Sequence, residues 1–256
     1  MSIAETAVRP AVSVRRRFWE IDAVRGVVVI LMVYFHTMWN LYYFGLSDAD
    51  VYSAGWQLFA RSIGSTFTFL LGLSLCIRRL RAPQGSAGFA EEARRGLLIF
   101  GCGMLVTLAT YLFTPDAFVI FGILHLQGLA MLLAYPFVRW PPFWSLLVGL
   151  ALIALGFAID TVFVDYPWLI PLGIQEYNRG MADYYPILPW FGFALLGVAA
   201  GRLFYPAGRR GFVLPEWGEL PPLRALGWLG SHSLPIYLIH QPIIIGALFA
   251  LGLARL

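Results

Sequence analysis

The chain has 256 residues, of which 59% are hydrophobic and only 12% are charged. Its mean hydropathy of +0.73 excludes an ordinary soluble domain, in which about a quarter of the residues carry a charge. The net charge of +4 comes from arginines alone, and the lack of lysine excludes a retinal protein, which needs a lysine amine for its Schiff base.

In chain order, seven apolar segments are each long enough to cross a hydrocarbon core of about 30 Å, which needs roughly 20 helical residues. These segments predict an all-α fold, a polytopic membrane helix bundle of about seven transmembrane helices. Residues 1–19 are predicted to form a basic N-terminal tail, and residues 20–256 a single transmembrane domain. The predicted spans are 21–43, 56–77, 95–114, 117–137, 143–163, 184–204 and 233–253.

The arginines between these spans indicate the orientation of the bundle. If the spans alternate, the arginines of the connecting segments all fall on one side except Arg179, and the opposite loops are mostly acidic. Because cytoplasmic loops carry the arginine excess, the N-terminus is predicted to be cytoplasmic and the C-terminus external. Arginines spread over helix ends, rather than gathered in one basic patch, also argue against nucleic acid as a partner.

The first span carries polar side chains on one helix face. Arg25 and His36 are three turns plus about 20° apart, and Asp22 and Asn40 lie near the same stripe. Such a stripe is predicted to face the bundle interior or a water-filled cavity, with Arg25 near the cytoplasmic surface and His36 about 16 Å farther out. A structural ion pair explains Asp22 and Arg25 as well as a functional site does, whereas function is favoured for His36 because an unpaired intramembrane histidine is costly.

Two further ionisable residues are predicted at the depth of His36. His125 lies about 12 Å below the outer surface by helix rise, and Arg61 lies somewhat nearer to that surface. These residues and His36 are therefore candidates for one site in the outer half of the membrane.

The start of the last span offers a candidate anion site. Ser231, Ser233 and Pro235 form a helix start signal whose free backbone N–H groups suit an anion, although an ordinary capped helix is the simpler interpretation. Asp183 is similarly placed to cap the span that follows it. No metal-ligand spacing, glycine-rich phosphate loop or Ser/His/Asp motif is present, so no metal is expected.

Four segments of the chain are distinctive in their order and spacing: "EIDAVRGVVVILMVYFH", "FGILHLQGLAMLLAYPF", "DYYPILPWFGFALLGVAAGRLF" and "SLPIYLIHQPI". Together they resemble the bacterial members of the heparan-alpha-glucosaminide N-acetyltransferase family, and the resemblance extends over nearly the whole chain. The spacing of Arg25 and His36 is also similar to that in the first helix of membrane acyltransferases that O-acetylate surface polysaccharides.

The resemblance implies a multi-pass acyltransferase of the bacterial inner (plasma) membrane. It would move an acetyl group from cytosolic acetyl-CoA to an amine or hydroxyl of a glycan or amino-sugar acceptor on the outer side. In the lysosomal relatives an asparagine stands at the position of His36 and the catalytic histidine lies in the following loop. Residues 41–55 contain no histidine here, so the catalytic role is expected to pass to His36.

The resemblance leads to a set of expected site residues. His36 is expected to be the general base, and His125 or Arg61 to stabilise the oxyanion. The acceptor is expected at Asn40, Asp183 and Tyr184. The residues expected to bind acetyl-CoA are Asp22, Arg25, Ser231, Ser233 and His240.

Two other function classes remain open on the sequence alone. A proton-coupled transporter would also use intramembrane charges, although the odd number of spans and the lack of an inverted repeat are weak arguments against it. A non-catalytic membrane partner in glycan assembly is the other alternative. The expected partners are the lipid bilayer and the acceptor, and a homo-oligomer is compatible with each of these functions.

Overall fold

The computed structural model describes residues 17–82, 88–175, 181 and 183–254, and these residues are almost entirely helical. Among these described residues, six helices are long and apolar enough to cross a membrane, which confirms the predicted all-α membrane bundle. Most of the predicted N-terminal tail lies outside the described residues. The six helices are α1 (Trp19–Tyr43), α2 (Ala54–Leu80), α3 (Gly88–Phe113), α5 (Pro142–Ile159), α6 (Ile187–Phe204) and α8 (Ser233–Ala250).

Two shorter helices depart from the predicted pattern. The segment predicted to span at 117–137 contains the 11-residue α-helix α4 (Ile123–Leu133), because its N-cap Gly122 is extended and residues 118–121 are not helical. Helix α7 (Pro221–Ser231) lies where no helix was predicted, and it begins with two prolines, which suit a first helical turn. The count of seven membrane crossings therefore stays a prediction. Short 3₁₀ helices lie at Pro115–Ala117, Pro136–Val138, Pro167–Leu172, Pro206–Gly208 and Trp217–Glu219.

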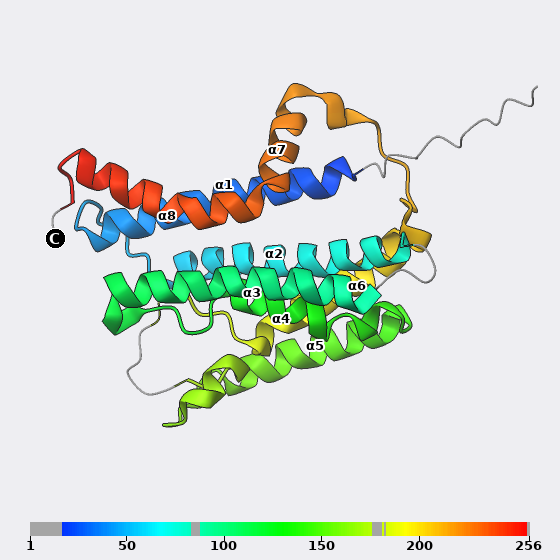
Figure 1. The fold of residues 1–256 in the computed structure, drawn as a ribbon, viewed down its shortest axis with the longest axis horizontal. Coiled ribbons are helices and arrows are strands. Elements are labelled where there is room, and N and C mark those ends of the chain that lie inside the picture. The colour runs from blue at the N-terminus through cyan, green and yellow to red at the C-terminus, as the bar shows by residue number, and fades with distance from the viewer. Residues whose placement is uncertain (1–16, 83–87, 176–180, 182, 255–256) are drawn as a thin grey trace, which may run out of the picture.

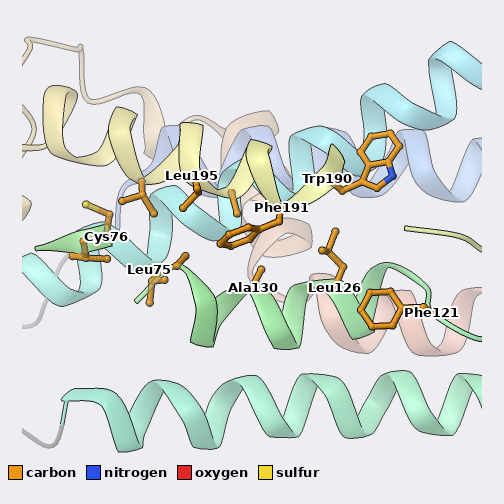
Figure 2. Packing of buried hydrophobic residues seen from close by; sticks show 12 residues of the cluster. Leu75, Cys76, Phe121, Leu126, Ala130, Trp190, Phe191 and Leu195 are labelled. Carbon is orange, nitrogen blue, oxygen red and sulfur yellow. The ribbon is translucent and has the colours of Figure 1, made fainter. Parts of the chain in front are cut away.

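The helices are arranged in layers (Figure 1). Helices α1 and α8 lie along one edge of the bundle and α5 along the opposite edge, with α2, α3, α4 and α6 between them. The core lies where α2, α4 and α6 meet, with Leu75, Leu126 and Leu195 among its fully buried side chains (Figure 2). Helix α7 packs across the first turns of α1.

Glycines allow two of these helix pairs to approach closely. A Cβ on Gly72 of α2 would lie 1.9 Å from the carbonyl oxygen of Ala194 on α6. A Cβ on Gly230 of α7 would lie 1.9 Å from the carbonyl oxygen of Asp22 on α1. Small residues at membrane helix interfaces serve this purpose, because they bring backbones into van der Waals contact. Helix α7 is thereby held against the part of α1 that carries Asp22.

The arginines that the sequence places on one side also meet at one end of the structure. Arg210 binds Glu20 at 2.8 Å, and Arg81 donates to the carbonyl oxygen of Gly208 at 2.6 Å. Arg79 and Arg139, which are far apart in sequence, both lie over the ring of Tyr135. This arginine-rich end is the one predicted to face the cytoplasm.

Helix α3 begins earlier than predicted. It starts at Gly88 rather than near residue 95, because its first turns are stabilised by charged side chains. Arg95 binds Glu91 at 2.7 Å within the helix, and Glu92 is buried against Arg78 of α2. The apolar part of the helix is therefore extended by a polar end that lies at the arginine-rich end of the bundle.

Candidate functional site

A cavity of about 690 Å³ lies at the arginine-rich end, among α1, α2, α3, α4 and α8. Its volume falls within the usual range for small-molecule sites, about 300–1,000 Å³. The charged side chains that line it are strongly biased to one sign, since five are arginines and Asp22 is the one acidic residue among the lining residues that the structure describes. The five arginines are Arg17, Arg25, Arg78, Arg81 and Arg95.

Arg25 is held between two helices. One nitrogen of its guanidinium donates to Asp22 Oδ1 at 2.9 Å, so the expected pair on α1 is present. The other terminal nitrogen donates to Ser74 Oγ of α2 at 2.7 Å. The guanidinium is therefore fixed in orientation at the cavity wall. Sequence analysis did not identify Ser74, because its role depends on the register between α1 and α2.

Arg78 is the second fixed cation of the cavity. It makes a bidentate pair with Glu92 of α3, with nitrogen to oxygen distances of 2.8 and 2.7 Å. Glu92 is only 1% exposed. Arg81 stacks on the Phe18 ring, with the guanidinium carbon 4.2 Å from the ring centroid. In the sequence these arginines indicate only the topology of the chain, whereas the structure brings them to one cavity.

The inner end of the cavity is formed by the start of α4 and by Tyr237 of α8. The Tyr237 hydroxyl donates to Asp183 Oδ2 at 3.1 Å, and the Ile123 N–H donates to the same oxygen at 3.0 Å. Asp183 therefore caps α4 and not α6, whose N-cap is Pro186. The expectation that Asp183 caps the following helix was wrong, because tertiary packing brings it to a different helix. Burial raises the pKa of the Asp183 carboxyl, and the two hydrogen bonds partly oppose this effect.

A pair of histidines lies next to Tyr237. The ring centroids of Tyr237 and His240 are 5.5 Å apart, and those of His240 and His36 on α1 are 4.7 Å apart. One turn farther along α1, Asn40 donates to Gln241 Oε1 of α8 at 2.7 Å. Polar side chains thus continue from the cavity, through the histidine pair, to an amide pair that joins α1 and α8.

The spacing along α8 explains this continuity. Ser233, Tyr237 and His240 are four and three residues apart, so they share one helix face. Ser233 and Tyr237 line the cavity, while His240 contacts Tyr237 and His36. Two residues expected to bind acetyl-CoA therefore lie in different places. Ser233 lines the cavity, whereas His240 lies beside His36, the expected general base.

His125 and Arg61 are engaged elsewhere. The Gly122 N–H donates to His125 Nδ1 at 3.1 Å, which stabilises the start of α4, and His125 Nε2 is 3.3 Å from Thr107 Oγ1 of α3. Arg61 lies 3.9 Å from Asp160 in a half-exposed pair. Among the described residues, neither makes a hydrogen bond, ion pair or ring contact with His36.

Two other expected site residues also have local partners. The Tyr184 hydroxyl donates to the carbonyl oxygen of Ile170 at 2.9 Å. Ser231 ends α7, where its hydroxyl donates to the carbonyl oxygen of Trp228 at 2.8 Å. The N-cap of α8 is consequently His232, and Ser231 does not line the cavity.

Comparison with known proteins identifies the family. The family model described as heparan-alpha-glucosaminide N-acetyltransferase, catalytic, matches residues 17–242. The chain belongs to this family. No curated protein and no solved structure matches it.

Family membership and the apolar helices together indicate an integral, multi-pass membrane acetyltransferase. The part of the chain that matches the heparan-alpha-glucosaminide N-acetyltransferase family includes all the cavity residues and the histidine pair. Among the residues that the structure describes, no group of three histidine, cysteine or acidic side chains could hold a metal ion.

Proposed function

We propose that this protein transfers an acetyl group from cytosolic acetyl-CoA to an amine or hydroxyl of a sugar or glycan acceptor on the opposite side of a bacterial plasma membrane. The observation that supports this proposal is the continuity between the arginine-lined cavity and His36. Tyr237 lines the cavity, and its ring centroid lies 5.5 Å from that of His240. The ring centroid of His240 lies 4.7 Å from that of His36.

The cavity suits the chemistry of acetyl-CoA. Guanidinium groups bind phosphates with directed, charge-assisted hydrogen bonds, and Arg25 and Arg78 are already held by protein partners. Preorganised donors of this kind need little reordering when an anion binds. Near Tyr237 the walls are apolar, with Ile123 and Leu124 of α4 among them. The nucleotide would therefore lie at the arginines and the pantetheine arm along α4 and α8.

His36 is the proposed general base. Its Nδ1 is 2.9 Å from the carbonyl oxygen of Met32. Because a carbonyl oxygen can only accept, Nδ1 carries the proton and the lone pair of the neutral ring is on Nε2. This nitrogen removes the proton from the acceptor while the acceptor attacks the thioester carbon. A carbon–nitrogen or carbon–oxygen bond replaces the carbon–sulfur bond, and His36 returns the proton to the thiolate sulfur.

His125 and Arg61 have no part in this proposal, because their polar groups already bind Gly122, Thr107 and Asp160. Asn40 keeps its expected place near the acceptor, and Gln241 is added because it pairs with Asn40. Their hydrogen bond fixes the spacing of α1 and α8 beyond the histidine pair, where the acceptor would approach from the opposite side of the membrane.

The test uses the purified protein in lipid nanodiscs with acetyl-CoA and a panel of amino sugars and glycans. Thiol release is measured together with incorporation of labelled acetyl into the acceptor, and the two are expected to be equal. A proton-coupled transporter or a non-catalytic partner would release no thiol with any acceptor. That result would overturn the proposed function.

A further inference from the structure

His240 has an unsatisfied polar atom within the membrane bundle. The side chain is only 6% exposed, and its Nδ1 is hydrogen-bonded to the carbonyl of Tyr237 one turn earlier. Its Nε2 is buried and has no hydrogen-bond partner among the described residues. Buried polar groups in folded proteins nearly always have a partner, because a buried group without one has lost its hydration and gained nothing.

The hydrogen bonds of the two histidines define what this atom can bind. Both rings direct Nδ1 to a backbone carbonyl, of Met32 for His36 and of Tyr237 for His240. Carbonyl oxygens accept, so both neutral rings carry the proton on Nδ1 and a lone pair on Nε2. The site therefore contains two imidazole acceptors, with ring centroids 4.7 Å apart. A ligand that satisfies His240 must supply an N–H or O–H donor.

The two histidines outside the pair do not share the buried, unsatisfied nitrogen of His240. His125 is equally buried, but both of its ring nitrogens have partners. His232 is exposed, and its Nδ1 lies 2.8 Å from the carbonyl oxygen of Trp228, four residues earlier, which is the same local arrangement as in His36. Local helix geometry thus accounts for the Nδ1 contacts and leaves the buried Nε2 of His240 to be explained.

We propose that His240 binds the acyl acceptor, its Nε2 accepting a hydrogen bond from a donor next to the group that His36 deprotonates. For an amine acceptor this donor is the second N–H, and for a hydroxyl acceptor it is a neighbouring hydroxyl of the sugar. The inference rests on the proposed function and assigns His240 to the acceptor, in place of the expected role in binding acetyl-CoA. His36 and His240 then hold the acceptor from two helices that come from opposite ends of the chain.

The experiment measures two dissociation constants by calorimetry for the full chain in nanodiscs, one with glucosamine as the acceptor probe and one with acetyl-CoA. His240→Phe keeps an aromatic ring and removes the acceptor atom, whereas His240→Gln keeps a side-chain acceptor. His232→Phe is the matched control, because it changes a histidine whose Nδ1 also contacts a backbone carbonyl of the preceding turn but which lies outside the site.

In His240→Phe, glucosamine binding is expected to weaken about tenfold to a hundredfold, the consequence of one lost hydrogen bond to a buried group. His240→Gln should recover part of the loss, and acetyl-CoA binding should stay within about twofold of the parent in both variants. The proposal is overturned if the parent does not bind glucosamine, if His240→Phe binds it as the parent does, or if acetyl-CoA binding falls equally. Failure of the proposed function is a separate result, the absence of thiol release by the parent.

Discussion

Arg25 illustrates how a single charged side chain can serve both the fold and the site. It binds Asp22 on its own helix and Ser74 on α2 while lining the cavity. Arg25→Ala is expected to weaken acetyl-CoA binding by about 1.5–3 kcal/mol, the usual range for a hydrogen bond to a charged group. Calorimetry measures this loss. Ser74→Ala removes the neutral partner and keeps the charge, so its effect should be smaller. Unchanged affinity in a folded Arg25→Ala protein would show that Arg25 is only the structural partner of Asp22.

Replacement of His36 is predicted to slow the transfer reaction without weakening the binding of acetyl-CoA. His36→Ala should abolish acetyl transfer, because general bases contribute typically about 10²–10⁴-fold to the rate. Acetyl-CoA affinity should be nearly unchanged, since the arginine-lined part of the cavity is intact. Thiol release and calorimetry on the same preparation measure the two effects. His232→Ala provides the control and should retain full activity. Substantial turnover by His36→Ala would rule out the general-base role.

At the scale of the elements, the contact between α7 and α1 can be tested with two glycines of one helix. Gly230 has no room for a Cβ against Asp22, whereas Gly227 has open space around its Cβ position. Gly230→Ala is expected to destabilise the protein by about 1–3 kcal/mol through overpacking. Gly227→Ala should be neutral or slightly stabilising, because alanine is the better helix former.

Thermal unfolding in detergent compares the two glycine variants. The acetyl-CoA dissociation constant is the second measurement, because displacement of α7 would disturb Asp22 and the Arg25 that it binds. Equal melting temperatures for Gly230→Ala and Gly227→Ala would contradict the close contact between the two helices.

The long helices were predictable because the bilayer imposes their length and apolar composition. The start of α8 at Ser233 was also predicted correctly. Helix α7 was missed because its 11 residues are too short for a span. The partners of Asp183 were not predictable, since Ile123 and Tyr237 are 60 and 54 residues away in sequence. The Arg25–Asp22 pair was predictable because it is local, whereas the Ser74 contact depends on how two helices pack.

At the scale of the whole molecule, the arginine-rich end defines a testable orientation. Arg209 lies at that end and Asp165 lies in the connection predicted to be external, and both are exposed. In intact cells, a membrane-impermeant maleimide should label Asp165→Cys and not Arg209→Cys. The reason is that arginine-rich loops stay on the cytoplasmic side.

Two controls complete the labelling experiment. The parent shows the background from Cys76, which is buried, and Cys102, which is half-buried. Permeabilised cells should allow labelling of Arg209→Cys. Labelling of Arg209→Cys in intact cells would show that the orientation is the reverse of the predicted one. The arginine-lined cavity would then face the outside, where it could not receive cytosolic acetyl-CoA. Ser86, in the connection between α2 and α3 and also predicted to be cytoplasmic, lies outside the described residues.

The cavity and the histidine pair both need α1 and α8, so they stay incomplete until α8 has been synthesised. A nascent chain that has inserted everything up to α7 contains Arg25 and His36 but neither Tyr237 nor His240. Until α8 enters the membrane, His36 has no neighbouring imidazole and the cavity has no wall from α8. Under the proposed function, a nascent chain without α8 could not transfer an acetyl group, and the reaction would begin only once this helix has entered the membrane.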